Sequence, residues 1–309
     1  MFSYRHAFHA GNHADVLKHA VLVQLLQYLN QKDKPYMVLD THAGAGRYNL
    51  DSGYAQKNEE FDTGITRLWG QKNLPPLLAD YLSAIEAANP PGTLRYYPGS
   101  PYLAKLLQRP GDQLRLYELH PSEIKVLQQN MGTPESRRPA HPDAAKNRPP
   151  KNPTARPAAY QIGPRVFIEH DDGFAALKAV LPPTQRRGLV LIDPPYEDKN
   201  DYIKVIKGVR EGLERFATGM YAVWYPQVQR NESKRFPEQL MKLPVTSWVH
   251  VALTVQEPSE DGFGLNGSGM YVANPPWTMV AQLKAALPYL VKTLGQDAGA
   301  KFELQYQED

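Results

Sequence analysis

Residues 188–196 read Gly188-Leu-Val-Leu-Ile-Asp193-Pro194-Pro195-Tyr196. The aliphatic run predicts a buried parallel strand, and the cluster that follows it falls at the carboxyl edge of a sheet, where open α/β sheets bind ligands. Asp193 and the carbonyl of Pro194 could accept the two hydrogens of a planar exocyclic amine and so return electron density to its nitrogen. Tyr196 offers a face on which a flipped base can stack. The alternative is a strand followed by an ordinary Pro-Pro turn.

A second glycine-rich motif occupies residues 36–46, Tyr36-Met-Val-Leu-Asp40-Thr-His42-Ala-Gly44-Ala-Gly46. Here too a short apolar strand ends in a turn, and its two glycines let the backbone approach a ligand closely. A dinucleotide-binding fingerprint would need a third glycine where Asn49 stands, and no Walker lysine pattern is present. A strand, an acid and Gly-x-Gly alone are typical of S-adenosylmethionine-dependent methyltransferases. The two motifs together predict methyl transfer to an amine.

Two further strand ends carry acids between these motifs. Glu118 ends the strand-like residues 114–118 and is placed to bind ribose hydroxyls. Asp172 lies in the strand-like stretch 166–174 and could accept a hydrogen from the cofactor's adenine amine. For either residue alone, a helix cap or a turn is the competing interpretation.

The chain resembles the RlmJ family of 23S ribosomal RNA adenine-N6 methyltransferases nearly from end to end. The resemblance rests on residues 3–19, 40–48, 96–101, 118–121, 193–196 and 224–226, and the long amino-terminal block makes it specific. It implies that Asp193 is the catalytic acceptor. It also implies cofactor contacts by His19, His42, Ser100, Glu118, Asp172 and Gly173. The glycine loop adds Gly44 to these candidate cofactor-binding residues.

Three amino-terminal residues match family positions implicated in handling the RNA target: Tyr4, His6 and Lys18. For Lys18 two interpretations stay open, a contact with an RNA phosphate or an ordinary surface pair with Asp15 one helical turn away. We expect Tyr4 to close over the flipped base opposite Tyr196.

The predicted fold is a class-I methyltransferase: Rossmann-like, with a mostly parallel seven-stranded sheet and helices on both faces. Residues 1–50 and 96–309 form this domain, with an arm at 1–11, and residues 51–95 form a small helical insertion on the cofactor side. An amphipathic helix is expected from Asn12 to Gln31, with Asn12 as its cap and a buried stripe along one face. Residues 248–255 and 270–274 are expected to form the antiparallel edge of the sheet.

Residues 132–165 depart from the family pattern. They hold eight prolines and seven Lys/Arg against two acids, a composition that cannot bury enough apolar surface to order itself. A solvated loop and a basic arm that touches ribosomal RNA phosphates are the two interpretations.

Composition limits the remaining possibilities. The 309 residues are 42% hydrophobic and contain no cysteine, which excludes disulfides and thiolate metal sites. No apolar run is long enough to span a membrane, so we expect a cytoplasmic protein, and the net charge of +3 permits RNA binding without requiring it. Five of the nine histidines lie in the first 42 residues, but their spacing fits no metal motif, so no metal is expected. We also expect a monomer.

The predicted reaction transfers a methyl group from S-adenosylmethionine to adenine N6 in 23S ribosomal RNA, with the flipped base held by residues 193–196. A guanine-N2 ribosomal RNA methyltransferase and a DNA adenine methyltransferase share this local chemistry. A non-catalytic RNA-binding assembly factor is a rival from another class, opposed by the intact Asp193, Gly44 and Gly46. A glutamine-modifying enzyme ranks last, because it usually has Asn where Asp193 stands.

Overall fold

A single mixed sheet organises the molecule. The computed structural model describes residues 6–132, 165–259, 262 and 264–308. Eight strands lie in the order β10-β8-β9-β7-β6-β1-β4-β5. The five parallel strands are β5 (Arg165–Glu169), β4 (Gln113–Tyr117), β1 (Met37–Asp40), β6 (Gly188–Ile192) and β7 (Met220–Gln227).

The antiparallel part of the sheet contains one strand more than predicted. β9 (Gly267–Ala273) lies between β7 and β8 (Trp248–Thr254) and is antiparallel to both, as the sequence indicated for this edge. β10 (Lys301–Gln307) then pairs antiparallel with β8, so the sheet has eight strands rather than seven. β10 is attached through its backbone at the sheet's edge, and six of its seven residues are exposed.

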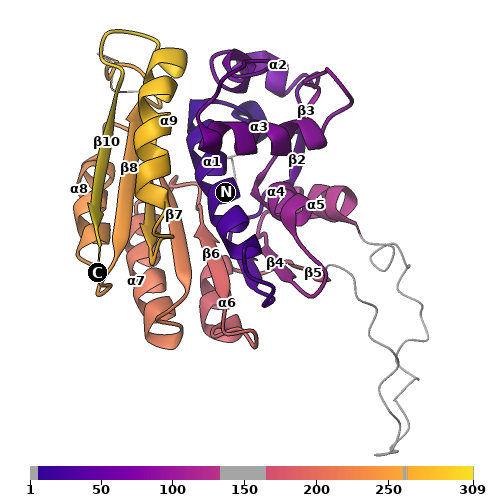
Figure 1. Cartoon of the computed structure of the whole chain (residues 1–309), viewed down its shortest axis with the longest axis vertical. Helices are drawn as coiled ribbons and strands as arrows, with labels where there is room; N and C mark the ends of the chain where they lie inside the picture. Colours follow the sequence, from indigo (N-terminus) through magenta and orange to yellow (C-terminus); the bar gives the residue numbers. More distant parts are fainter. Residues whose placement is uncertain (1–5, 133–164, 260–261, 263, 309) are drawn as a thin grey trace, which may run out of the picture.

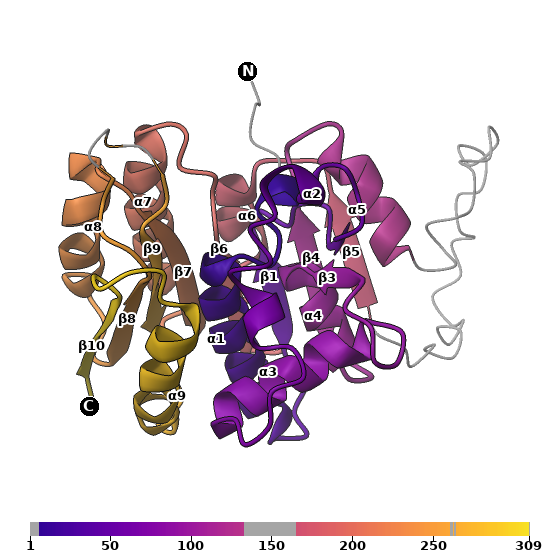
Figure 2. The same cartoon turned by 90° about the horizontal axis from the view of Figure 1, so that it is seen from above.

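Helices cover both faces of the sheet. One hydrophobic cluster joins the sheet to α1 (His13–Asn30), α3 (Pro76–Ala87), α4 (Ser100–Leu107), α5 (Glu123–Met131) and α9 (Met279–Leu294). A second cluster joins it to α6 (Gly173–Val180), α7 (Asn200–Arg215) and α8 (Asn231–Met241). Figure 2 shows α7 and α9 on opposite sides of the sheet. The predicted class-I α/β architecture is therefore confirmed.

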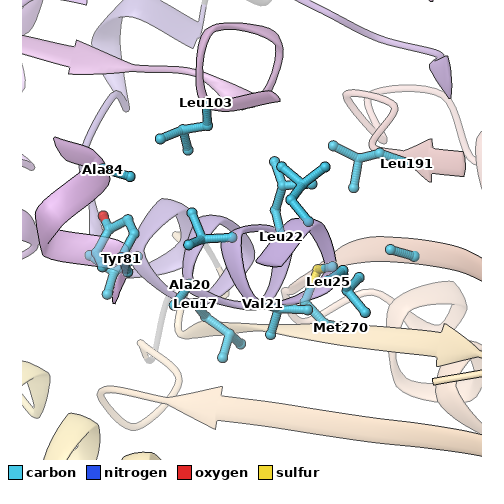
Figure 3. Close-up of a cluster of buried hydrophobic side chains, with 14 of the residues drawn as sticks. Leu17, Ala20, Val21, Leu22, Leu25, Tyr81, Ala84, Leu103, Leu191 and Met270 are labelled. Atoms are coloured by element: carbon cyan, nitrogen blue, oxygen red, sulfur yellow. The ribbon is translucent and has the colours of Figure 1, made fainter. Parts of the chain in front are cut away.

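α1 is the central helix of the molecule. The sequence predicted an amphipathic helix, but 15 of the 18 residues of α1 are buried. Figure 3 shows why: side chains of α1 meet Tyr81 and Ala84 of α3, Leu103 of α4, Leu191 of β6 and Met270 of β9. A helix enclosed in this way is apolar around most of its circumference, so it has no solvent face. The polar residues that it does carry are consequently buried as well.

The segment before α1 packs against the rest of the protein. Residues 6–8 form the 3-10 helix η1 (His6–Phe8), and Ala10 and Gly11 are buried. The Asn12 side chain accepts hydrogen bonds from the amides of Ala14 and Asp15, as predicted for a helix cap.

Residues 51–95 leave and rejoin the main domain through a short antiparallel ribbon, β2 (Arg47–Asn49) with β3 (Tyr96–Pro98). Between these strands lie α2 (Ala55–Asn58), η2 (Ile65–Arg67) and α3. Figure 1 shows α2, α3 and β3 together at one end of the molecule. Their buried side chains belong to the same cluster as α1, so this segment has no separate core. Most of the predicted basic loop, residues 133–164, lies outside the described residues.

Candidate active site

The acids singled out in the sequence gather at one edge of the sheet. Asp40 ends β1, Asp193 follows β6 and Glu118 follows β4, and these three strands are parallel neighbours. Their carboxyl ends therefore meet at the edge where α/β folds bind ligands. The pairing of these parallel strands therefore brings together acids that are far apart in the sequence.

The Asp193 carboxylate forms an ion pair with Lys18 of α1. Lys18 Nζ lies 2.7 Å from Asp193 Oδ2 and 3.0 Å from Asp15 Oδ1, so the ammonium bridges two carboxylates. The Lys18 side chain is 6% exposed, that of Asp15 is 1% exposed and that of Asp193 is 15% exposed. The interpretation of Lys18 and Asp15 as a surface pair is wrong, because both side chains are buried. The ammonium binds carboxylates in this structure, and a contact of Lys18 with an RNA phosphate stays a prediction. Burial of α1 on all sides explains the difference.

Asp15 connects this ion pair to the amino-terminal segment. Its Oδ2 accepts hydrogen bonds from His6 Nε2 at 2.8 Å and from the Gly11 amide at 2.9 Å. Burial acts to raise the pKa of Asp15, but His6, Lys18 and His19 together hold that pKa well below its ordinary value. Asp15 is therefore an anion at neutral pH, and its charge orients both His6 and Lys18.

Asp40 is a second buried carboxyl beside the site. Its Oδ2 accepts a 2.6 Å hydrogen bond from Ser100 Oγ, which opens α4. Burial and the neighbouring charge of Asp193 raise the pKa of Asp40 to about 7, against the lowering effect of the Ser100 hydrogen bond. Ser100 thus lies beside the end of β1, and Asp40 fixes its hydroxyl.

Glu118 holds two loops together. Its two carboxylate oxygens accept hydrogen bonds from the Gly44 amide at 2.8 Å and the His120 amide at 2.7 Å. Burial raises the pKa of this carboxyl. Each oxygen has a second lone pair, so Glu118 can still accept hydrogen bonds from a diol while bracing the glycine loop.

The glycine loop after β1 needs its glycines for conformation. Gly44 and Gly46 have φ angles of +60° and +80°. A Cβ on Gly44 would lie 2.6 Å from the Tyr48 hydroxyl, and one on Gly46 would lie 3.0 Å from Leu127. Asn130 of α5 donates to the carbonyls of residues 45 and 47 and so fixes the far side of the loop. The sequence motif found the glycines but contained no signal for Asn130.

His19 is buried and His42 is partly buried, and both are neutral. Burial lowers the pKa of each to about 3. His19 Nδ1 lies 2.7 Å from the Tyr97 hydroxyl, whereas its Nε2 is buried without a hydrogen-bond partner among the described residues. His42 Nδ1 lies 2.8 Å from Thr41 Oγ1, and its ring packs edge-on against Phe174. A buried ring nitrogen without a partner is the feature expected of a residue that binds a polar ligand.

Asp172 and Gly173 form the start of α6. The Asp172 side chain caps this helix by accepting from the Phe174 amide at 2.9 Å, and the residue is exposed. A Cβ on Gly173 would lie 1.9 Å from the Thr41 carbonyl oxygen, so glycine is required for α6 to approach the loop after β1. The cap was the competing interpretation of Asp172, and it is the contact seen here.

The Tyr196 ring lies in the core rather than on an open face of the site. Tyr196 is 3% exposed, its hydroxyl donates to the Trp224 carbonyl at 2.6 Å, and its ring centroid is 4.6 Å from that of Tyr202. Its φ angle of +53° turns the chain sharply after the two prolines. The stacking face predicted for Tyr196 is thus covered in this conformation. Trp224, in contrast, is only partly buried. Lys18 Nζ lies 5.5 Å from the centroid of its ring.

Tyr4 lies outside the described residues. No cluster of three or more His, Asp or Glu side chains that could hold a metal ion occurs in the described part of the chain, and none of its helices has the length and apolarity to cross a membrane.

The eight-stranded sheet, the glycine loop and the acids at three strand ends define a class-I methyltransferase. The family model described as "Ribosomal RNA large subunit methyltransferase D, RlmJ" matches residues 33–155 and 157–306. The chain belongs to this RlmJ family, as the sequence predicted.

Individual relatives agree with the family match. The chain is 45% identical over 290 residues to ribosomal RNA large subunit methyltransferase J of Escherichia coli, covering 94% of this chain and 93% of the relative. It is 43% identical over 307 residues to the protein of the same name from Haemophilus influenzae, covering 99% of each. A crystal structure of protein LPL1258 from Legionella pneumophila superposes with a TM-score of 0.80 at 34% identity, covering 97% of this chain and 99% of that one.

Proposed function

We propose that this protein transfers the methyl group of S-adenosylmethionine to N6 of an adenine in 23S ribosomal RNA. The observation that carries the proposal is the buried Asp193–Lys18 ion pair at the carboxyl end of β6, in a chain of the RlmJ family. Lys18 binds Oδ2 of Asp193, whereas Oδ1 has no hydrogen bond to a described residue. The ion pair therefore presents one fixed acceptor oxygen to an incoming amine.

The residues along the edge fit S-adenosylmethionine. Glu118 would accept from the ribose hydroxyls, Asp172 from the adenine amine, and the partnerless Nε2 of His19 would bind a polar group of the methionine portion. The positive φ angles of Gly44 and Gly46 hold the loop's backbone close to this region. When bound, the cofactor supplies a methyl group on a sulfonium, which is already an activated leaving group.

The chain's own residues then handle the amine. Asp193 and the Pro194 carbonyl accept its two hydrogens, which orients the nitrogen lone pair and counteracts its delocalisation into the ring. Lys18 holds the Asp193 carboxylate in place, so that it can receive the proton that becomes acidic as the nitrogen is alkylated. Exclusion of water and positioning supply the acceleration.

A flipped base needs an aromatic face, and the covered ring of Tyr196 does not offer one in this conformation. We infer that either Tyr4 and Trp224 flank the base, or residues 194–196 rearrange when RNA binds. The family also supports action on ribosomal RNA in the cytoplasm, and we expect the enzyme to act as a monomer.

Mapping of N6-methyladenine in 23S ribosomal RNA from cells with and without this protein tests the proposal. A methylated adenine that disappears with the protein supports it. Loss of N2-methylguanine instead, or methylation of DNA but not RNA in vitro, would replace it with one of the alternatives. Failure of the purified protein to bind S-adenosylmethionine would indicate the non-catalytic assembly factor.

The role of Asp193 is tested separately with Asp193→Ala. We expect methyl transfer to be abolished while most cofactor affinity remains, because the carboxylate faces the amine rather than the cofactor. Near-normal turnover by a folded variant would remove Asp193 from the mechanism.

A further inference from the structure

A cluster of aromatic and cationic side chains lies outside the site described above. Phe8 of η1 packs edge-on against Tyr54, with ring centroids 5.3 Å apart, and Lys57 Nζ lies 5.7 Å from the Phe8 centroid. Tyr54 is 49% exposed although it is a large aromatic residue. We call Phe8, Tyr54 and Lys57 the α2 platform. Figure 2 shows α2 beside the indigo segment that precedes α1.

Two sets of contacts join the α2 platform to α1, the helix that carries Asp15 and Lys18. Glu60, just after α2, binds His9 Nδ1 at 2.9 Å and Asn12 Nδ2 at 2.9 Å, which ties this segment to the start of α1. On the other side, η1 contains His6 as well as Phe8, and His6 binds Asp15.

The chain of contacts then continues from Asp15 through Lys18 to Asp193, with each step at 3.0 Å or less. η1 thus carries both a residue linked to the catalytic carboxylate and a residue of the α2 platform. Because η1 is three residues long, these two features lie close together.

We propose that the α2 platform is a subsite for an unpaired nucleotide that flanks the target adenine, a proposal that rests on the RNA-methylating function above. Extruding one base from its stack leaves its neighbours with exposed faces. Tyr54 provides a ring on which such a neighbour stacks, Phe8 supports that ring from beside it, and Lys57 adds a positive charge for the phosphate. Stacking of this kind tolerates any base, so the subsite contributes RNA affinity rather than sequence selection.

The test compares Tyr54→Ala, Tyr54→Phe and the parent enzyme on unmodified 23S ribosomal RNA transcript at saturating S-adenosylmethionine. We expect Tyr54→Ala to raise KM for RNA about 5- to 150-fold, which corresponds to about 1–3 kcal/mol per stacked base. kcat at saturating RNA and cofactor affinity are expected to stay at the parent values, and Tyr54→Phe is expected to retain the parent KM. Lys57→Ala is expected to reduce the slope of log affinity against log salt by about 0.7–1.

Trp277 provides a matched control. It is 83% exposed, and it follows β9, which runs antiparallel to β7 and so ends at the opposite edge of the sheet from Asp193. Trp277→Ala removes a larger exposed ring without touching the proposed subsite, and its KM for RNA is expected to equal that of the parent.

The outcomes separate this inference from the proposed function. An active parent with equal KM values for Tyr54→Ala and Tyr54→Phe overturns the α2 platform as a subsite and leaves the function intact. An equal rise in KM for Trp277→Ala also overturns it, since the effect would then be general to exposed aromatics. A parent that methylates no ribosomal RNA overturns both.

Discussion

Replacing Lys18 with methionine removes the cation that lies between the buried carboxylate of Asp15 and the partly buried carboxylate of Asp193. Methionine keeps the length and most of the apolar volume of lysine, so packing of α1 is preserved while the charge is lost. Asp15 and Asp193 then lose contacts of 3.0 Å and 2.7 Å at side-chain exposures of only 1% and 15%. Breaking a buried ion pair by removing one partner costs about 3–5 kcal/mol.

The lower part of that range applies to Lys18→Met. Asp15 keeps its hydrogen bonds from His6 and from the Gly11 amide, and water can reach part of Asp193. We therefore expect the free energy of unfolding to fall by about 3 kcal/mol. Methyl transfer should be lost as well, because Asp193 is no longer held.

Urea unfolding followed by tryptophan fluorescence measures the loss of unfolding free energy, and two further variants serve as controls. Lys204→Met breaks another pair of the same i,i+3 spacing and the same 3.0 Å distance, with Asp201, but Lys204 is 49% exposed. That change should cost no more than about 1 kcal/mol. Asp193→Asn added to Lys18→Met removes one uncompensated charge and should restore about 1 kcal/mol or more. Equal losses for Lys18→Met and Lys204→Met, or strict additivity in the double variant, would refute the reasoning.

Three other changes test the rest of the site. Glu118→Ala should weaken S-adenosylmethionine binding by about 2–4 kcal/mol, the loss of two hydrogen bonds to a charged acceptor, and unchanged affinity by calorimetry would contradict the ribose assignment. Asp40→Asn should gain stability relative to the parent as pH rises from about 4 to about 7. The folded-state pKa of Asp40, near 7, lies above its unfolded value, so the parent's carboxyl contributes stability at low pH and this contribution is lost as pH rises through that range. Parallel pH profiles of the urea midpoints of the two proteins would argue against this. His6→Ala should slow methyl transfer while cofactor binding is retained, since it removes the 2.8 Å bond to Asp15, and a parent-like rate would show that η1 is positioned by its other contacts.

The sequence predicted well those elements whose signals are local. The aliphatic run before Asp193 gives β6 the bounds Gly188–Ile192, because a strand buried on both faces is continuously apolar and its ends are marked by polar residues. The acids that follow β1, β4 and β6 could be brought to one edge from the sequence alone, because parallel strands share a direction. The Asn12 cap was likewise a local signal.

One strand escaped although its pattern was present. Residues 301–307 alternate polar and apolar side chains, Lys-Phe-Glu-Leu-Gln-Tyr-Gln, which is the period of a half-exposed strand. Because β10 is exposed at the edge of the sheet, it carries no continuous apolar run of the kind that marks a buried strand in the sequence.

The surroundings of side chains were not predictable, because they depend on contacts across long separations. Lys18 and Asp193 are 175 residues apart, and nothing near Lys18 indicates its partner. Periodicity indicated a solvent face for α1, so Asp15 and Lys18 were interpreted as a surface pair. In the structure both residues are buried. The covered ring of Tyr196 follows from Tyr202 on the next helix and from Trp224 and Phe236 further along the chain, none of which belongs to the motif that suggested an open ring.

The charge network from His6 to Asp193 has a purpose other than stability. A buried ion pair is commonly no more stabilising than apolar residues of similar volume, because desolvation offsets the attraction between the charges. The fold could therefore bury α1 equally well without Asp15 and Lys18. What apolar residues cannot do is fix the orientation of a carboxylate, and here one ammonium does this for Asp193 while Asp15 fixes the ammonium. His6 binds the same Asp15. Asp15 therefore holds both η1, the segment proposed to contact RNA, and, through Lys18, the Asp193 carboxylate proposed to bind the amine.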